Sequence, residues 1–542
     1  MTSVTNINEV LEGHVGLDLA CVDRLYLNAY VPNLQVPGQV VTFMTGHLGL
    51  PIPSPAVMQK IGTRFRAAVK AFADEHDVPV LHLKKPDRTR WDDRKLDHVT
   101  PYLEPAEREG RFGLVSIVAA QEYQWVFSAK NRSSVPGRPS FDFLKEDRRV
   151  GTYYFYVLDP EFGPGFVKIC TYFPYPAKVW VNGHEWAKRQ AAKAGLGFAE
   201  LKNGFASCAD PARLQAICES FGPDDVQGFF DRTTALIPTP FSEADRAAGY
   251  FYELSMRQVE VSRTLVFDDP RRARSFFEAL VEENVSIGHP DEMAAVFSAQ
   301  VRRRGPRKTP GPFRTRVFTP GTEVKVDFSF RHSRVKQYLK EGRALRIETV
   351  INKPSDLGVL SRIVHLPELV ERGRAINDRL LRIERAGQGC AIGSALFERI
   401  HQPFKDEGQR TGALRFGDQR AMALAGALCF VVGAVTGFTN KSLRGLVAGL
   451  LGADYTSGQM SYDLRRLRLH RLIERLDGTN TYVVTNEGIR VAVFYTKLKD
   501  RLLAPLLEAD QPPAPIPIRR ALATLEHGLD DYVAHARLGT AA

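Results

Sequence analysis

The sequence contains little cysteine and no apolar segment long enough to cross a membrane. Its 542 residues include six cysteines, and none of them belongs to a CxxC pair. This spacing excludes a zinc ribbon and a disulfide framework, and it favours a reducing compartment. The longest apolar run, 421–435, stops short of the ~18 residues of a membrane helix, and residues 1–20 lack a signal-peptide pattern. We therefore expect a cytoplasmic protein with no membrane partner.

The common catalytic motifs are missing as well. The chain has no P-loop of the form GxxxxGKS or GxxxxGKT, which argues against an ATP motor, and no GxSxG or HExxH pattern. The absence of an HxH pair argues against a rolling-circle nickase that holds its metal ion with histidines. The glycine-rich segment 387–393 follows an expected helix instead of a strand, so it is a poor nucleotide loop. No cofactor is evident from these motifs, and Mg²⁺ is the metal ion that the carboxylates of the chain suggest.

Positive charge is abundant and concentrated in one region. The net charge is +11, and residues 302–348 hold 14 Lys and Arg against 4 Asp and Glu. Such a stretch predicts an anionic partner, DNA or RNA, whereas the alternative is a basic protein without a polyanionic ligand. The nucleic-acid contacts that we expect in this region are Arg302, Arg303, Arg304, Arg307, Lys308, Lys336, Lys340, Arg343 and Arg346.

The length and the order of the expected elements predict an α+β multidomain protein. At 542 residues the chain is too long for one core, so two to four domains are the starting expectation. Residues 210–300, including 243–266, are expected to be mainly helical. The expected parts are an α/β domain (1–127), a β-hairpin followed by a helical region (141–300), a basic strand–helix region (301–410), a winged-helix domain (417–508), and a Pro-rich connector with a terminal helix (509–542).

The last third of the chain carries the clearest pattern. Three helices are expected between 419 and 476, followed by a hairpin around Asp477-Gly478 and a closing helix. The segment SYDLRRLRLHRLIERLDGTNTYVVTNEG (461–488) resembles the recognition helix, wing and following helix of the winged helix-turn-helix domains in bacterial regulators and replication proteins. The resemblance implies base or sugar contacts by Thr456, Gln459, Ser461 and Tyr462, phosphate contacts by Arg465, Arg466 and Arg468, and a wing at Asn480 and Thr481. Packing or homodimer formation is the alternative use of such a domain.

Carboxylates at expected strand ends are the candidates for chemistry. Asp23, Glu122, Asp159, Glu185 and Glu348 lie at or next to such ends, and two or three of them can converge to hold Mg²⁺ for phosphodiester cleavage. Lys168 or Lys188 can serve beside them. The alternative is that they are ordinary surface carboxylates, which are common at strand ends.

Two further groups have both a functional and a structural interpretation. His184 and Glu185 can act as an acid–base pair, or they begin a helix. Five tyrosines can stack on unpaired bases or supply a nucleophile, or they fill a core. These tyrosines are Tyr153, Tyr154, Tyr156, Tyr172 and Tyr175.

The segment 332–352, HSRVKQYLKEGRALRIETVIN, is similar to the K-x-Y-x-K…LR-x-E segment of some phage and plasmid replication proteins. The alternative is a solvated basic strand with a surface pair between Arg346 and Glu348. The whole chain also resembles a set of bacterial proteins of this length, a resemblance that implies no function.

These patterns favour a nucleic-acid-binding protein of a bacterial mobile-element, replication or defence system, and they leave open whether it also carries out metal-dependent phosphodiester chemistry. One alternative is a non-enzymatic transcriptional regulator with a large sensing region. Another is an assembly protein that dimerises through the winged helix.

Overall fold

The computed structural model describes residues 11, 13–83, 94–132, 140–285, 314–318, 325–330, 332–387, 393–406, 408–431, 437–476, 478–499 and a few between 520 and 528. The expected phosphate contacts at 302–304 and 307–308 lie outside these residues. The chain divides into two compact units. The large unit comprises 10–277 and 301–377, and the small unit comprises 378–542 with 1–9 and 278–300. Each unit is considered by itself.

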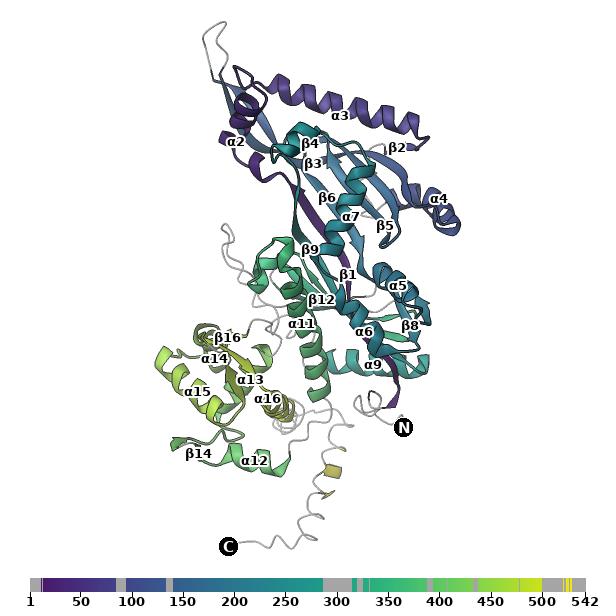
Figure 1. Cartoon of the computed structure of the whole chain (residues 1–542). Helices are drawn as coiled ribbons and strands as arrows, with labels where there is room; N and C mark the ends of the chain where they lie inside the picture. The colour runs from purple at the N-terminus through teal and green to yellow at the C-terminus, as the bar shows by residue number, and fades with distance from the viewer. Residues whose placement is uncertain are drawn as a thin grey trace, which may run out of the picture. The chain divides into compact units, whose positions relative to one another are not determined.

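The large unit is built on one eleven-stranded sheet with the order β10-β11-β12-β13-β9-β1-β6-β5-β4-β3-β2 (Figure 1). All neighbouring strands are antiparallel except β2 and β3. The α+β class is therefore confirmed. The strands are β1 (Val15–Tyr30), β2 (Val80–His82), β3 (Gly113–Asn131), β4 (Phe141–Asp159), β5 (Gly163–Cys170), β6 (Ala177–Asn182), β9 (Glu253–Phe267), β10 (Arg314–Phe318), β11 (Lys325–Phe330), β12 (Ser333–Lys340) and β13 (Ala344–Ile351). A separate hairpin is formed by β7 (Phe198–Leu201) and β8 (Gly204–Cys208).

Helices pack on both faces of this sheet. They are α2 (Pro37–Thr42), α3 (Pro55–Glu75), α4 (Arg94–Glu109), α5 (Gly183–Lys193), α6 (Pro211–Ser220), α7 (Pro223–Leu236), α8 (Glu243–Ala247), α9 (Pro270–Val285) and α11 (Leu366–Gly387). Short helical turns lie at 32–34, 43–47, 354–357 and 363–365. Both α9 and α11 run across the boundary between the units.

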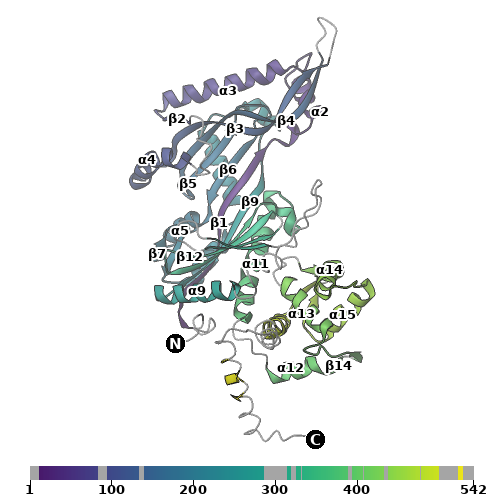
Figure 2. The ribbon, with the colours of Figure 1, turned by 180° about the vertical axis from the view of Figure 1, so that it is seen from behind.

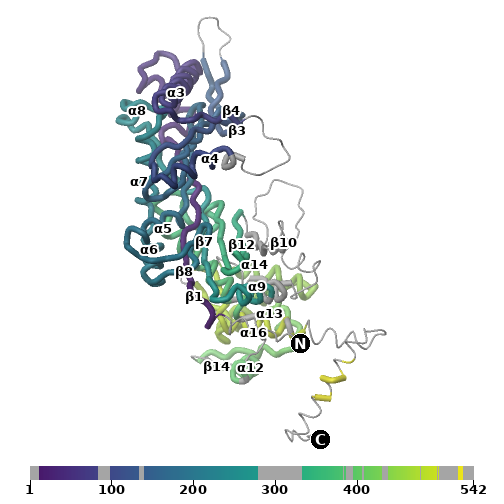
Figure 3. The backbone as a smooth tube through the Cα atoms, turned by 90° about the vertical axis from the view of Figure 1, so that its right-hand side faces the viewer, coloured from purple at the N-terminus to yellow at the C-terminus, as the bar shows by residue number. Residues whose placement is uncertain are grey.

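The two faces of the sheet can be told apart by the helices that cover them. Val99 of α4 packs with Val118 and Tyr154, so we call the face that bears these side chains the α4 face. On the opposite face, Phe229 of α7 lies so close to Gly165 that a side chain at Gly165 would clash with its ring. Helix α7 lies in front of the sheet in Figure 1 and behind it in Figure 2, and the side view of Figure 3 separates α7 from α4.

The structure corrects the expectation that residues 243–266 are helical. A short helix, α8, ends at Ala247, and β9 begins at Glu253 and lies between β1 and β13 in the middle of the sheet. The alternation of apolar and polar residues in VEVSRTLVF (259–267) is that of a strand. The expectation failed because the helical character of the preceding residues was extended across the turn at Gly249.

An irregularity in β1 positions the residues that matter below. The pairing of β1 with β9 shifts between Val22 and Leu25, so Asp23 and Arg24 together lie opposite Glu260. Such a bulge re-aims side chains and is frequent beside functional sites. Gly183, the first residue of α5, packs against this bulge, since a Cβ there would lie 2.3 Å from the carbonyl oxygen of Val22. A glycine is therefore required at this contact between α5 and β1.

The small unit combines helices with a three-stranded sheet of order β16-β18-β17. Its apolar core includes Leu424, Val447, Met460, Leu464 and Tyr495. Its elements are α12 (Ser394–His401), β14 (Phe404–Asp406), β15 (Gln409–Thr411), α13 (Gln419–Val431), β16 (Phe438–Thr439), α14 (Asn440–Leu451), α15 (Ser457–Leu469), β17 (Ile473–Arg475), β18 (Thr481–Val484) and α16 (Asn486–Leu498). None of the described helices has the length and apolar character needed to span a membrane.

Candidate metal centre

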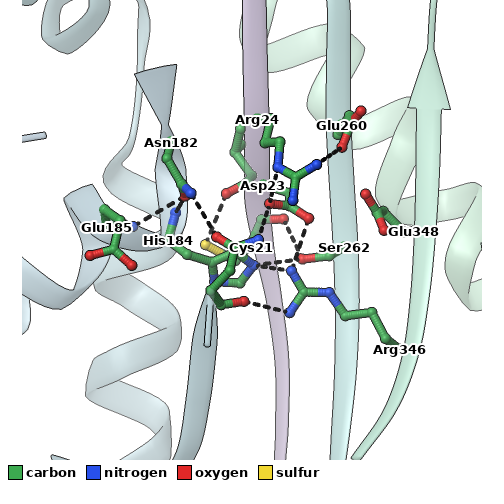
Figure 4. Close-up of polar contacts among 12 residues, drawn as sticks. Cys21, Asp23, Arg24, Asn182, His184, Glu185, Glu260, Ser262, Arg346 and Glu348 are labelled. Atoms are coloured by element: carbon green, nitrogen blue, oxygen red, sulfur yellow. Dashed lines mark hydrogen bonds and ion pairs between the residues drawn. The ribbon is translucent and has the colours of Figure 1, made fainter. Parts of the chain in front are cut away.

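Three carboxylates from three adjacent strands meet on the sheet of the large unit. They are Asp23 on β1, Glu260 on β9 and Glu348 on β13, and their side chains are exposed by only 1, 4 and 3%. One oxygen from each lies within 4.8 Å of the others, an arrangement that can hold a metal ion. We call these residues the acidic triad (Figure 4). Three oxygen ligands at a buried position suit a hard divalent cation such as Mg²⁺ or Mn²⁺.

Each carboxylate of the triad has a cationic neighbour, and Asp23 has two, since Arg24 Nε also lies 3.8 Å from Asp23 Oδ1. Arg346 Nη2 lies 2.9 Å from Asp23 Oδ2, and Lys336 Nζ lies 3.6 Å from Glu348 Oε1. Arg24 Nη1 lies 3.9 Å from Glu260 Oε2, which is too far for a hydrogen bond. Buried charges are expensive unless they are paired, so these cations make the triad tolerable in the folded protein.

Glu260 is the least satisfied member of the triad. Its Oε1 accepts a hydrogen bond from Gln258 Nε2 at 2.5 Å, whereas its buried Oε2 has no hydrogen-bond partner. Burial and the neighbouring Glu348 raise the pKa of Glu260 to about 7. A carboxyl group in this state holds a proton that a divalent cation can replace, and the free oxygen is the natural ligand position.

The pKa of Asp23 is shifted in the opposite direction from that of Glu260. Burial by itself would raise its pKa, but the guanidinium of Arg346 and the amide of Asn203 lower it below the ordinary value. Asn203 Nδ2 donates to Asp23 Oδ1 at 2.7 Å. Asp23 is therefore ionised, and it provides a fixed negative charge beside the titratable Glu260.

Arg346 connects the triad to three other elements. This side chain is completely buried and donates to the Asn203 carbonyl oxygen at 3.2 Å and to Thr264 Oγ1 at 3.0 Å. Its Nη2 also lies 2.6 Å from His184 Nε2, which is 3.0 Å from Ser262 Oγ. The β7–β8 turn and the first turn of α5 are thus fixed against the sheet around one guanidinium, and Figure 4 shows His184 of α5 beside Arg346.

Tyr338 lies at the edge of the triad. Its hydroxyl donates to Glu348 Oε2 at 3.1 Å, and its ring is half-buried. In the register of β12 and β13, Tyr338 is opposite Arg346 and Lys336 is opposite Glu348, so all four share the α4 face. Tyr338 and Lys336 are therefore the residues beside Glu348 that retain contact with solvent.

Of the five carboxylates that the sequence predicts as candidates, Asp23 and Glu348 belong to the triad, and Glu122, Asp159 and Glu185 do not. Glu122 on β3 binds Tyr154 and Lys168, four strands from β1 in the sheet. Asp159 accepts two hydrogen bonds from Arg232 and closes the turn after β4. Glu185 pairs with Lys188 along α5. These three do not converge because each lies in a different part of the fold with its own cation.

The acid–base pair of His184 and Glu185 does not form. His184 is 1% exposed and turns toward Arg346 and Ser262, whereas Glu185 turns toward Lys188.

The five tyrosines considered for base stacking lie mainly in the core. Tyr154 and Tyr156 pack in an apolar cluster, Tyr175 is fully buried and Tyr153 packs on Phe65, while Tyr172 is half-buried.

The structure also corrects two interpretations of the 332–352 segment. Arg346 and Glu348 do not form a surface pair, since both are buried and Arg346 binds Asp23 instead. A completely buried Arg346 is unavailable to phosphate from the surface. Lys336, Lys340 and Arg343 are half-buried, and burial lowers the pKa of Lys340.

In the small unit, the expected contact residues fall into two groups. Tyr462, Arg465 and Arg468 are exposed on α15. Arg466 is directed inward, where it binds Asp463 and the carbonyl oxygens of Gly412 and Ala413. Gln459 is exposed, but its side chain caps α15 by accepting hydrogen bonds from Thr456. Arg466 is thus a structural residue, because α15 packs there on the β14–β15 hairpin.

Sequence reasoning missed Glu260 and Tyr338. Glu260 was overlooked because its segment was assigned to a helix; the alternation in residues 259–267 was the signal that would have found it. Tyr338 stands within the K-x-Y-x-K pattern of residues 336–340, but only the pairing of β12 with β13 brings it to Glu348.

No family model, curated protein or solved structure matches the chain. The resemblances to winged-helix domains and to replication proteins therefore stay predictions.

The protonation of Glu260 generates a stability prediction. Its pKa of about 7 in the folded protein lies above its ordinary value of 4.5. The stability that the protonated carboxyl group contributes to the folded protein is therefore fully present at low pH and is lost as the pH rises through 7. In EDTA we expect the melting temperature of the wild type to fall between pH 5.5 and 8, and Glu260→Gln to reduce that fall. Differential scanning fluorimetry of both proteins checks this. An equal decline in both would show that Glu260 does not titrate in this range.

Proposed function

We propose that the protein binds nucleic acid and cleaves its phosphodiester backbone with a divalent cation held by Asp23, Glu260 and Glu348. The supporting observation is the convergence of these three buried carboxylates, together with the Glu260 Oε2 that lacks a hydrogen-bond partner. A cation at this position would activate water and neutralise the charge that develops on the phosphate in the transition state. Lys336, half-buried beside Glu348, would bind a phosphate oxygen.

The small unit supports the nucleic-acid part of the proposal. From α13 to α16 the elements follow the order helix, strand, two helices, two strands and helix, which resembles the order in winged-helix domains. We infer that α15 is the recognition helix. Thr456 caps its N-terminus, and its exposed face carries Tyr462, Arg465 and Arg468. Side chains from such a helix reach base edges and phosphates. The alternatives, a regulator without enzymatic activity and a dimerisation domain, both predict an intact substrate in the experiment that follows.

Loss of cation binding and of cleavage should follow from the same substitutions. For Glu348→Gln and Glu260→Gln we expect weaker Mn²⁺ binding by calorimetry. Cleavage of labelled single-stranded and duplex DNA and RNA should fall about 100-fold or more, because a catalytic cation contributes several kcal/mol. Glu122→Gln is the matched control, a carboxylate of the same sheet outside the triad. A wild-type protein that forms no product with Mg²⁺ or Mn²⁺ would refute the proposal.

A second candidate function, transesterification through a protein hydroxyl, is favoured by the position of Tyr338. Its hydroxyl donates to Glu348, which can accept the phenolic proton as the oxygen attacks phosphorus. The new bond joins the phenolic oxygen to phosphorus, the bond from phosphorus to the leaving sugar oxygen breaks, and that oxygen takes a proton from water. The product would be a tyrosyl phosphodiester and a free hydroxyl end.

Tyr338→Phe separates the two routes. If Tyr338 is the nucleophile, the wild type should form a covalent adduct with labelled oligonucleotide on a denaturing gel, and Tyr338→Phe should lose both adduct and product. If water attacks, no adduct should form and the variant should retain most of the activity. Tyr153→Phe, on the opposite face of the sheet, controls for the loss of a tyrosine hydroxyl elsewhere.

The exposed arginines of α15 generate a binding prediction. Arg465→Ala with Arg468→Ala should weaken binding and lower the slope of log affinity against log salt by about 2, one for each lost phosphate contact. Arg466→Ala should instead lower the melting temperature, because it leaves the buried Asp463 with one cation fewer. Fluorescence anisotropy at several salt concentrations measures the first effect. An unchanged slope in the double variant would remove α15 from the interface.

A further inference from the structure

Beyond the acidic triad, the α4 face carries three aromatic side chains on neighbouring strands. Tyr26 on β1 is opposite Trp180 on β6, and Trp180 is opposite Phe166 on β5. Paired residues of antiparallel strands project to the same face, so the three rings form a continuous row across the sheet. Each ring is half-buried and keeps some contact with solvent. We call Tyr26, Trp180 and Phe166 the aromatic strip.

The rings of the strip are held in defined positions. The rings of Phe166 and Trp180 are nearly parallel, with 5.9 Å between centroids and 7° between planes. Tyr26 meets Phe166 edge-on at 6.3 Å. Beyond Phe166, Tyr154 and Tyr156 continue the aromatic surface toward α4. Rings fixed by their neighbours lose little freedom when a ligand stacks on them.

Two cations lie over the strip. Lys178 Nζ is 5.3 Å from the centre of the Tyr26 ring, and the Arg257 guanidinium is 6.0 Å from it. Within the part of the chain that the structure describes, neither side chain forms an ion pair. Lys168, in contrast, is paired with Glu122. Lys178 and Arg257 therefore give the strip a positive charge that is not paired directly with a carboxylate of the described residues.

The strip begins next to the triad. Tyr26 follows Asp23 and Arg24 on β1, and it is opposite Gln258 of β9. Gln258 in turn donates to the Glu260 carboxylate. Gln258 and Glu260 are two residues apart on β9 and project to the same face, so the strip and the triad share one side of the sheet. A ligand that lies along the strip would reach the triad without crossing another element of the sheet.

We propose that the aromatic strip, with Lys178 and Arg257, binds a single, unpaired strand of DNA or RNA and leads it to the acidic triad. The inference rests on the proposed function and names the substrate class of that site. Unpaired bases expose flat faces that stack on aromatic rings, whereas the base faces of a duplex are already stacked inside the helix. The two cations match the phosphates of such a strand.

The test measures binding in EDTA, where no cleavage occurs. Fluorescence anisotropy would compare a labelled oligonucleotide in single-stranded and duplex form, each as DNA and as RNA, on the full chain. Trp180→Leu should weaken single-strand binding on the order of tenfold and leave duplex binding unchanged, because each base stacked on a ring contributes substantially. The matched control is Trp125→Leu, a 60% exposed tryptophan on the opposite face. Equal effects of the two substitutions, or an equal loss of duplex binding, would overturn the proposal.

Lys178 supplies a second, independent readout. Burial, with Arg257 and Lys168 nearby, lowers its pKa to about 8. Single-strand affinity should therefore fall as the pH rises from 7 to 9, because the amine loses its charge in this range. Lys178→Arg stays charged and should remove most of that fall. The same pH dependence in Lys178→Arg would show that Lys178 does not contact the strand.

A third measurement needs no substitution. Photocrosslinking of the wild type to an oligonucleotide containing 5-bromouracil, followed by peptide mass spectrometry, should label the peptides of Tyr26, Phe166 or Trp180. Crosslinks confined to the small unit would overturn the proposal. This is also the result expected if a segment of the chain covered the strip. Strip binding without cleavage would support this inference and refute the proposed chemistry. Metal-dependent cleavage that Trp180→Leu leaves unchanged would support the proposed chemistry and refute this inference.

Discussion

The buried ion pair between Asp23 and Arg346 is the interaction on which the organisation of the large unit depends. It joins β1 to β13 across β9, and Arg346 also fixes the β7–β8 turn and the start of α5. A completely buried guanidinium is costly unless its charge is neutralised. Asp23 provides the counter-charge, and Asp23, Thr264 and the Asn203 carbonyl accept hydrogen bonds from Nη1 and Nη2, whereas Nε has no hydrogen-bond partner among the described residues. The polar cluster is therefore a structural junction as well as a candidate site.

The cluster lies at a boundary on one face of the sheet. On one side of it, α5 and the β7–β8 hairpin cover the strands through His184 and Asn203. On the other side, the aromatic strip remains partly exposed. The bulge at Asp23 and Arg24 creates this boundary, since it changes which residues of β1 project to the α4 face. Binding and chemistry are thus proposed for adjacent parts of one surface.

The two units contribute different physical properties to the proposed function. The small unit exposes Arg465 and Arg468 on a helix whose core is complete without them. The large unit instead buries a cluster of charged groups, Asp23, Glu260, Glu348 and Arg346, beside the partly exposed strip. Exposed arginines provide salt-dependent attraction, whereas a buried carboxylate cluster can hold a metal ion away from bulk water.

Local sequence patterns were sufficient to predict the α+β class and the positions of many strands and helices. These follow from local periodicity and from residue types that favour strands, helices and turns. The same patterns singled out Asp23 and Glu348 as candidate ligands, and Arg346 as a phosphate contact, which its burial contradicts. Tertiary structure alone decided that Asp23, Glu260 and Glu348 meet, because they are brought together by the pairing of β9 with β1 on one side and with β13 on the other, and all three strands are distant in the sequence. It likewise decided that Glu122, Asp159, Glu185 and Arg466 have other partners, since sequence spacing does not specify which buried charge finds which counter-ion.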